Sequence, residues 1–265
     1  MHNSDHFSKL DAPAWNALNS VQQSFATGTG HAKRYRRGIL PFAACEPGYE
    51  NEISALDAMV QPGEIFYLIG ELPPLPHHYT VLKELPCVQM VLQNPVPTIE
   101  TNATVLPLSV NDKGDMFNLI NKVQPGYYEP DTYQLGNYFG IRQEGKLVAI
   151  AGERMRLDGL TEISAICTDP DYTGRKYAQQ LIAALCLHNL QQDITPFLHV
   201  IETNERAIGL YEYMGFVVRR TISFWQIQLN AERLTRIHPM CSFQGICTFM
   251  KFRKQERFAG SKASV

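Results

Sequence analysis

Apolar residues in the second half of the chain recur with two periods. Alternating apolar positions predict strands, whereas apolar positions three and four residues apart predict helices. Ala178, Leu181, Ile182 and Leu185 show the helical spacing, and the turn pair Glu144-Gly145 between two apolar runs predicts a hairpin. The predicted elements are a strand at 104–110, a helix at 112–123, a hairpin at 138–157, a strand at 161–168, a helix at 174–192, a strand at 196–202, a helix at 204–216 and a strand at 217–229.

The order of these elements, β-α-β-β-β-α-β-α-β, indicates the fold class. Strands joined by short turns pair in antiparallel fashion. We therefore expect an α/β (α+β) protein with a mixed, mostly antiparallel sheet that is flanked by helices.

The first half of the chain has a different texture, because prolines interrupt its apolar runs. Strand-like runs at 64–70 and 87–93 and a helix near 12–26 predict a smaller α/β lobe. Prolines in the segment Asn94–Thr98 disfavour both helix and strand, so this segment predicts a linker. We expect an N-terminal lobe at 1–101, a second domain at 102–235 and a C-terminal extension at 236–265. The end of that extension is basic, small and polar, and we expect it to fray.

Composition and charge narrow the classes of partner. Hydrophobic residues make up 45% of the chain and charged residues 19%, a composition that can bury a sizeable core. The formal charge of −2 does not favour a nucleic-acid partner, and we expect the basic run at 33–37 to be a solvated face. The N-terminus lacks the pattern of a signal peptide, and no apolar run approaches the roughly 18–20 residues of a membrane span.

The cysteines bear on redox state and metal binding. None forms a C-x-x-C pair, and none shares a zinc-binding spacing with histidine. Two of them lie in apolar periodic runs, where cysteine is usually a small core residue. We expect reduced thiols in a cytoplasmic protein, and no metal. The six residues are Cys45, Cys87, Cys167, Cys186, Cys241 and Cys247.

A short polar loop separates the strand predicted at 161–168 from the helix that follows it. The stretch TEISAICTDPDYTGRKYA, residues 161–178, passes through an Asp-Pro turn into a loop with one glycine and two cations. The first backbone N–H groups of a helix have no partner inside the helix, and such groups bind anions. The loop therefore predicts an anion site, although an ordinary strand–turn–helix with two exposed cations explains the same residues.

Two motifs together resemble the GNAT N-acetyltransferase superfamily. In that family a loop of the form Arg/Gln-x-x-Gly-x-Gly/Ala opens a helix, and here the loop TGRKYA departs from the form at Thr173 and Lys176 and matches it at Ala178. The family's later motif, N-x-x-A-x-x-L-Y-x-x-x-G-F, is matched at every position, by Asn204, Ala207, Leu210, Tyr211, Gly215 and Phe216. The resemblance covers residues 104–229. The proline-rich first lobe is similar to the degenerate lobe of the glycine N-acyltransferase-like branch.

The resemblance implies an acyl-CoA-dependent N-acyltransferase that transfers acetyl from acetyl-CoA to a primary amine by direct attack. Lys176 stands where the family has glycine, so its side chain either obstructs the phosphates or adds a cation beside them. The acceptor, a small-molecule or peptide amine, is left open, and the sequence is compatible with a homo-oligomer. The implied coenzyme-binding residues are Ile166, Cys167, Thr168, Thr173, Gly174, Arg175, Lys176, Tyr177, Ala178, Asn204 and Tyr211.

Three residues are candidates for proton transfer. Tyr211 is the candidate acid for the leaving thiolate, although its helical spacing also suits a core residue. The resemblance places Glu162 at the position of a catalytic glutamate. Few charges precede or follow it, so we expect burial to raise its pKa into the range of a useful base. Glu153 on the preceding strand is the rival base, and a chain of water molecules could replace either.

Two other functions are compatible with the same residues. A non-catalytic acyl-CoA-binding module would explain the altered loop. An interaction protein would use the first lobe, where the stretch PPLP could dock a partner.

Overall fold

The computed structural model describes residues 6–28, 30–100 and 103–230. The chain divides into a unit of residues 1–232 and a second unit of residues 233–265, and only the first contains described residues. The predicted C-terminal extension, with Cys241 and Cys247, lies outside them.

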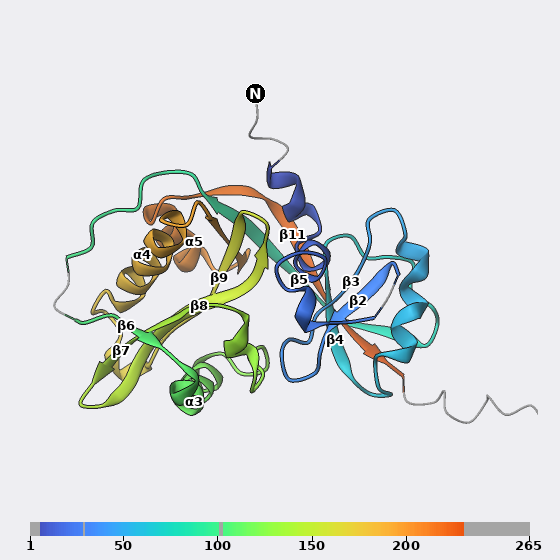
Figure 1. Ribbon diagram of the computed structural model, residues 1–265, viewed down its shortest axis with the longest axis horizontal. Coiled ribbons are helices and arrows are strands. Elements are labelled where there is room, and N and C mark those ends of the chain that lie inside the picture. Colours follow the sequence, from blue (N-terminus) through green and yellow to red (C-terminus); the bar gives the residue numbers. More distant parts are fainter. Residues whose placement is uncertain (1–5, 29, 101–102, 231–265) are drawn as a thin grey trace, which may run out of the picture. The chain divides into compact units, whose positions relative to one another are not determined.

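The main feature of the first unit is an eight-stranded sheet with the order β4-β11-β5-β10-β9-β8-β7-β6 (Figure 1). Every pair of neighbouring strands is antiparallel except β9 and β10, which are parallel. The predicted mixed, mostly antiparallel sheet is therefore confirmed. Its strands are β4 (Ile65–Ile69), β5 (Tyr79–Leu92), β6 (Leu106–Leu108), β7 (Tyr138–Gln143), β8 (Lys146–Leu157), β9 (Leu160–Thr168), β10 (Thr195–Ile201) and β11 (Phe216–Leu229).

The predicted order of elements after residue 104 is also confirmed. Helix α3 (Lys113–Val123) follows β6, α4 (Tyr177–Leu190) follows β9, and α5 (Glu205–Tyr213) follows β10. The predicted hairpin joins β7 to β8. Its turn residues Glu144 and Gly145 both have positive φ, at 50° and 81°, which suits the right-handed twist of the two strands.

Helices α3 and α4 cover opposite faces of the sheet (Figure 1). Met116 and Ile120 of α3 pack with Ile150 of β8 in one apolar cluster. Leu181 and Leu185 of α4 pack in another cluster, with alternate residues of the same strand such as Ala149 and Ala151. Each fully buried leucine or isoleucine contributes roughly 1.5–3 kcal/mol, so these two clusters fix the strands between them.

The first part of the chain adds a three-stranded sheet, with the order β1-β2-β3. Its strands are β1 (Ala26–Thr27), β2 (Ala32–Tyr35) and β3 (Ala43–Cys45), and the helix beside them is α2 (Pro13–Leu18). The helix predicted near 12–26 is therefore shorter than expected. Pro13 occupies its first turn, and the side chains of Asn19 and Ser20 bond to helix carbonyls near its end, where such residues compete with helix propagation.

The basic run at 33–37 is not the solvated face that we expected. Arg34 is only 3% exposed and pairs with Glu64, and Tyr35 is fully buried. Arg37 also pairs with Glu64, at 2.7 Å. A single carboxylate, directly before β4, therefore holds two of the cations of this run.

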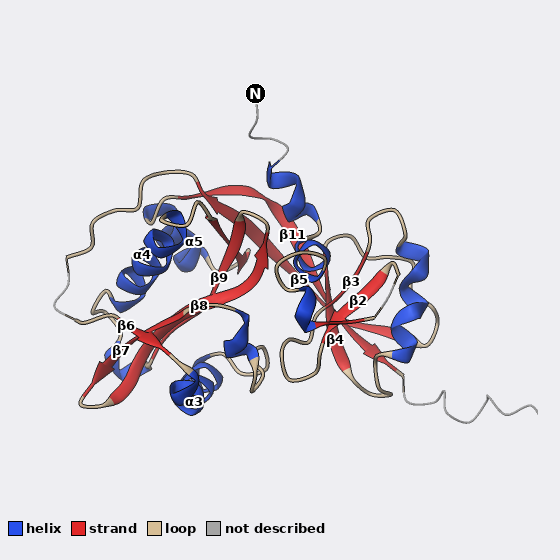
Figure 2. Ribbon diagram, in the orientation of Figure 1, coloured by secondary structure: helices blue, strands red, loops and turns tan. Residues whose placement is uncertain are grey.

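Strands β5 and β11, with 14 residues each, are the longest strands among the described residues (Figure 2). They pair over their whole lengths, and β5 lies between β11 and β10. The runs predicted as strands at 64–70 and 87–93 thus belong to the same sheet as the strands after residue 104. The division of the chain at residue 101 stays a prediction.

Candidate active site

Strands β9 and β10 separate partway along their length. Their parallel pairing runs only from Leu160 to Glu162 on β9, although β9 continues to Thr168 and β10 to Ile201. Ala165 has a φ of 52°, and the register between β8 and β9 shifts at this point. An extra residue in a strand bends it away from its neighbour. Because a non-glycine residue in this conformation costs roughly 1–2 kcal/mol, the bend at Ala165 must be held by the packing around it.

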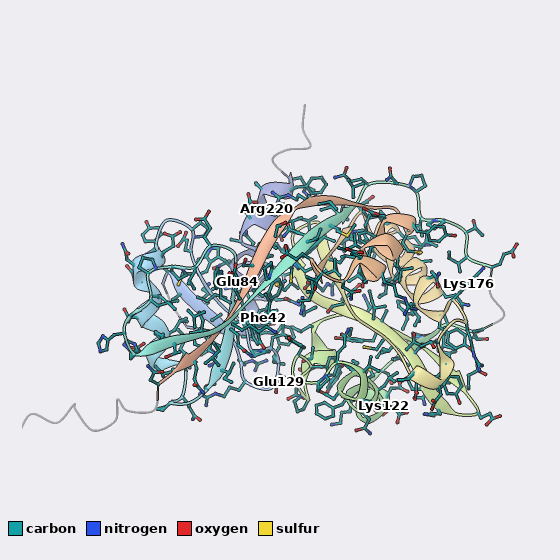
Figure 3. The ribbon with its side chains drawn as sticks, turned by 180° about the vertical axis from the view of Figure 1, so that it is seen from behind. Phe42, Glu84, Lys122, Glu129, Lys176 and Arg220 are labelled. Atoms are coloured by element: carbon teal, nitrogen blue, oxygen red, sulfur yellow. The ribbon has the colours of Figure 1, made fainter. Side chains whose placement is uncertain are left out.

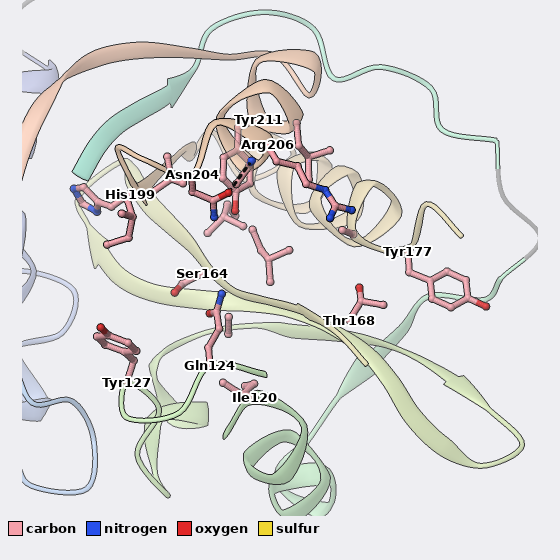
Figure 4. Close-up of a pocket in the computed structure, with 18 of the residues that line it drawn as sticks. Ile120, Gln124, Tyr127, Ser164, Thr168, Tyr177, His199, Asn204, Arg206 and Tyr211 are labelled. Carbon is pink, nitrogen blue, oxygen red and sulfur yellow. Dashed lines mark hydrogen bonds between the residues drawn. The ribbon is translucent and has the colours of Figure 1, made fainter. Parts of the chain in front are cut away.

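A cavity of about 1020 Å³ opens where the two strands part (Figure 4). Tyr177, Thr168 and Arg206 lie at one end of it, and His199 and Tyr127 lie at the other. We call these the loop end and the histidine end. Ten of the residues predicted to bind the coenzyme line this cavity, namely Ile166, Thr168, Thr173, Gly174, Arg175, Lys176, Tyr177, Ala178, Asn204 and Tyr211.

The loop end is built from the segment between β9 and α4. Gly174 and Lys176 have φ values of 77° and 60°, and this left-handed backbone delays the start of α4 from the predicted Gly174 to Tyr177. No side chain of the described residues caps α4, so its first N–H groups are available to a ligand. The guanidinium of Arg175 lies 5.0 Å from the ring centre of Tyr172. Unpaired N–H groups and two cations together suit an anion.

A buried carboxylate anchors the start of this loop. Asp169 is 1% exposed and pairs with Lys146 at 2.8 Å and with Lys122 at 3.0 Å. Hydrogen bonds from these two lysines lower the pKa of Asp169 to about 2. Lys122, one of the two partners of Asp169, is labelled in Figure 3. The same view shows Lys176 at the start of α4, far from Phe42.

Tyr211 of α5 lines the cavity between the two ends. Burial, and to a smaller extent the nearby Cys167, raise the pKa of its phenol to about 12, so it keeps its proton at neutral pH. At the start of the same helix, Asn204 is the N-cap, as predicted, and accepts a hydrogen bond of 3.2 Å from the backbone N–H of Ala207 (Figure 4).

Glu162 does not have the surroundings that we expected. It is 0% exposed and does not line the cavity. It accepts a hydrogen bond of 2.8 Å from Nε of Arg154 and shares one of 2.7 Å with Nδ1 of His199. Burial alone would raise the pKa of Glu162, but the charge and hydrogen bonds of Arg154, with the contact to His199, lower it to about 2. The prediction of a raised pKa is therefore wrong, because Arg154 and His199 come from other strands.

Glu153 is also buried, and it too lies outside the cavity lining. It accepts hydrogen bonds from the backbone and side chain of Asn137 and one of 2.7 Å from the side chain of Asn189 on α4. These contacts place its carboxylate toward α4. Its role as the base stays a prediction, and its contacts explain it as a structural carboxylate.

Cys167, the third predicted site residue that does not line the cavity, is 2% exposed in the cluster under α3. Burial raises its pKa to about 12, so its thiol stays protonated and is a poor nucleophile. Among the described residues, no group of histidine, cysteine or acidic side chains could hold a metal ion. The helices in this part of the chain are all too short or too polar to cross a lipid bilayer.

The sequence analysis missed the residues of the histidine end. Arg154 and His199 both line the cavity, and Gln89 of β5 holds His199 through a contact of 3.0 Å between the two Nε2 atoms. Gln89 and His199 are polar residues with apolar neighbours on both sides in their strands. Buried polar groups must find partners, so this pattern was a signal that these two residues belong together.

Comparisons with known proteins agree with this geometry. The model of the FR47-like protein family matches residues 138–225. A GNAT-family protein of known structure from Novosphingobium aromaticivorans is 32% identical, with a TM-score of 0.76, over 83% of this chain and 98% of that chain. A GCN5-related N-acetyltransferase from Kribbella flavida is 15% identical, with a TM-score of 0.56, over 81% of this chain and 92% of that chain, and resembles it in fold.

A mycothiol acetyltransferase from Acidimicrobium ferrooxidans is 32% identical over 114 residues, which are 40% of this chain. The chain spans 35% of the length of that curated relative.

Proposed function

Because the chain belongs to the GNAT family of acetyltransferases, we propose that it transfers the acetyl group of acetyl-CoA to a primary amine by direct attack. The observation that carries this proposal is the separation of β9 from β10 beyond Glu162. It leaves one edge of β9 free beside a cavity that begins at the uncapped N-terminus of α4.

Acetyl-CoA is a co-substrate that would enter at the loop end. The first N–H groups of α4 and the cations Arg175 and Lys176 would bind its pyrophosphate. The free edge of β9, from Ile166 to Thr168, would bind the pantetheine arm through its backbone. Both features are present in the described residues without rearrangement, which supports the fit of the coenzyme to this cavity.

Tyr211 is the residue that we propose as the acid. The amine attacks the thioester carbonyl, an oxyanion forms, and the carbon–sulfur bond then breaks with the proton passing to sulfur. The Tyr211 pKa of about 12 keeps the phenol protonated at neutral pH, so the group has a proton to give to the departing sulfur.

Loss of the amine proton is the step for which the sequence left three routes open. A carboxylate with a pKa near 2, such as Glu162, is a weak base at neutral pH. The adjacent His199 has contacts at both ring nitrogens. We therefore propose that water in the cavity takes the proton, and that Glu162 instead holds Arg154 and His199 in place.

The remaining finer assignments are also proposals. We propose a first lobe at 1–101, a catalytic domain at 102–235 and an extension at 236–265. We also propose that the chain falls in the glycine N-acyltransferase-like branch. A small separate sheet, β1-β2-β3, ahead of the larger one supports a reduced first lobe.

The variant Tyr211→Phe tests the reaction. It keeps the ring and its packing against Phe216, so we expect acetyl-CoA to bind as before while kcat falls about 10²–10⁴-fold, the usual effect of losing a general acid. Thiol release on a panel of amines gives kcat, and isothermal titration calorimetry gives the affinity for acetyl-CoA.

Tyr213→Phe is the matched control, since Tyr213 lies on the same helix and lines the same cavity but is 60% exposed. Its kcat should match that of the wild type. A wild-type rate for Tyr211→Phe would return Tyr211 to a packing role. Binding of acetyl-CoA without turnover of any amine would favour the non-catalytic binding module.

A further inference from the structure

The charged residues that line the cavity are all cationic. They are Arg154, Arg175, Lys176 and Arg206, and no aspartate or glutamate is among the described lining residues. Arg175, Lys176 and Arg206 belong to the loop before α4 and the first turn of α5, where the coenzyme phosphates would lie. Arg154 is at the other end, close to His199 and Phe224. This end is where an acceptor would enter.

We propose that the acceptor is an amine that also carries a carboxylate, and that Arg154 binds this carboxylate. The proposal rests on the acetyl transfer proposed above and names its substrate class. It excludes polyamines and other acceptors with several cationic groups, because the cavity offers them arginines and no carboxylate.

The hydrogen bonds of Arg154 leave part of its guanidinium free. Its Nε and Nη2 atoms donate to the two oxygens of Glu162. A guanidinium has five N–H donors in a fixed fork and can bind two carboxylates at different edges. Its Nη1 has no hydrogen-bond partner among the described residues. The side chain of Arg154 is 15% exposed and lines the cavity, whereas that of Glu162 is 1% exposed and does not.

Two aromatic rings and a hydrogen bond from Gln22 hold Arg154 in position. Its guanidinium carbon lies 5.0 Å from the ring centre of Phe42 and 5.7 Å from that of Phe224. Its backbone carbonyl accepts a hydrogen bond of 2.7 Å from Gln22. A donor that is fixed in this way before the substrate arrives loses little freedom on binding, so its contact contributes more to affinity.

The histidine beside Arg154 uses both of its ring nitrogens in contacts with the protein. Gln89 accepts from Arg219 with its oxygen and donates to the carbonyl of Leu10 with its nitrogen, which fixes the amide orientation. The amide nitrogen therefore faces Nε2 of His199 as a donor, and His199 accepts there and donates from Nδ1 to Glu162. Because both ring nitrogens of His199 are engaged by Gln89 and Glu162, Arg154 is the group at this end, within the described part of the chain, with a free donor for an anion.

The first test compares acceptors on the unmodified full chain. Amino acids, β-alanine and 4-aminobutyrate are each paired with the matching carboxamide, and spermidine represents acceptors without a carboxylate. With acetyl-CoA present, thiol release gives rates and mass spectrometry identifies products. We expect kcat/KM for the preferred acid to exceed that for its carboxamide by about 100-fold or more, because a site built for hydrogen bonding rejects an analogue that lacks the group.

The amine of a carboxamide is less basic than that of the acid, so a larger fraction of it is in the neutral form that attacks. This intrinsic difference favours the carboxamide, so a faster reaction of the acid cannot be explained by it. Equal or faster acetylation of carboxamides or of spermidine would overturn the inference and leave the proposed function intact. Absence of turnover with every amine would overturn the proposed function, and the inference with it.

The second test changes the protein. Arg154→Met alone would leave Glu162 as an unpaired buried charge, so the diagnostic variant is Arg154→Met with Glu162→Gln. We expect the preference for the acid over its carboxamide to disappear, while the Kd of acetyl-CoA is unchanged. Arg154→Lys should reduce the preference only in part, because lysine keeps the charge without the planar fork.

Arg206→Gln is the control, since Arg206 lines the cavity near the loop end. It should alter the KM of acetyl-CoA and keep the acid-to-carboxamide ratio. An unchanged ratio in both Arg154 variants would overturn the assignment of Arg154.

Discussion

The two ends of the cavity are built in different ways. The loop end comes mainly from the segment before α4, with Arg206 of α5 beside it, and its binding groups are backbone N–H groups and the side chains of Arg175 and Lys176. The histidine end combines single residues of β5, β8, β9, β10 and β11 with Phe42, which directly precedes β3. Its ion pair, between Arg154 and Glu162, is largely buried.

Because of this difference, the interactions at the two ends respond to different solution conditions, namely salt and acid. Exposed cations without paired carboxylates interact with a ligand over long distances, and salt weakens that interaction. A buried ion pair is screened much less, but it depends on the ionisation of its carboxylate. Ionic strength should therefore act on coenzyme binding, and acid should act on the histidine end.

The largest effect is expected when the charge of the loop end is reversed. Arg175→Glu together with Lys176→Glu removes two charge-assisted contacts of roughly 1.5 kcal/mol each, so Kd for acetyl-CoA should rise about 100-fold. The loss should be larger at low salt than at high salt. Isothermal titration calorimetry at two salt concentrations measures both effects.

Lys83→Glu with Lys113→Glu changes the net charge by the same amount at two exposed lysines that do not line the cavity. This control variant should bind acetyl-CoA as the wild type does. If the loop variant also kept its affinity at low salt, the loop would not be the phosphate site.

A smaller effect concerns acid. The pKa of Glu162 is lowered from 4.5 to about 2 in the folded protein, so its ionised form stabilises the fold above about pH 5, and this stabilisation is lost as the pH falls toward 2. The shift corresponds to on the order of 3 kcal/mol. The free energy of unfolding, measured with urea, should therefore fall more between about pH 6 and pH 3 in the wild type than in the Arg154→Met, Glu162→Gln variant.

Other carboxylates such as Asp169 also lose their ion pairs in acid, but they are common to both proteins and cancel in the difference. Arg175→Gln provides the comparison at the loop end. Its free energy of unfolding, plotted against pH, should stay parallel to that of the wild type. Parallel curves for all three proteins would mean that the Arg154–Glu162 pair contributes no net stability.

The smallest effect is expected at Lys176, one of the two positions at which the loop departs from the family form. Lys176 has a φ of 60°, which glycine adopts without strain and other residues adopt at a cost of roughly 1 kcal/mol. Lys176→Gly should therefore be more stable to denaturant than Lys176→Ala by up to about 1 kcal/mol. Both variants lose the cation, so their affinities for acetyl-CoA should be equal.

Equal stabilities of these two variants would show that the backbone at residue 176 relaxes. Unequal affinities would show that the Cβ atom itself touches the coenzyme. The pair of variants therefore separates the backbone strain of Lys176 from its charge.

The elements after residue 104 were predictable because their signals are local. Glu144-Gly145 specifies its turn without help from the rest of the chain, and Asn204 specifies the start of α5. The start of α4 was predicted three residues early, because the left-handed conformation of Lys176 is set by the packed loop and not by the residue type.

The histidine end was not predictable in the same way. The neighbours of Glu162 along the chain are apolar, and an environment judged from them alone implies a raised pKa. The groups that lower it, Arg154 and His199, lie 8 and 37 positions away in sequence. Only the register of β8, β9 and β10 brings the three together, and sequence periodicity does not fix that register.

The position of β5 inside the sheet also sets the order in which the chain can fold. Both strand partners of β5 lie more than 100 residues further along the chain. During synthesis β5 therefore leaves the ribosome long before β10 and β11 exist, with its hydrogen-bonding edges open. Pairings between such distant segments form slowly, because the entropy of closing the loop must be met first. The cavity, which Phe224 of β11 lines, consequently takes its final shape only after β11 has been made, and until then both edges of β5 stay open to misassembly.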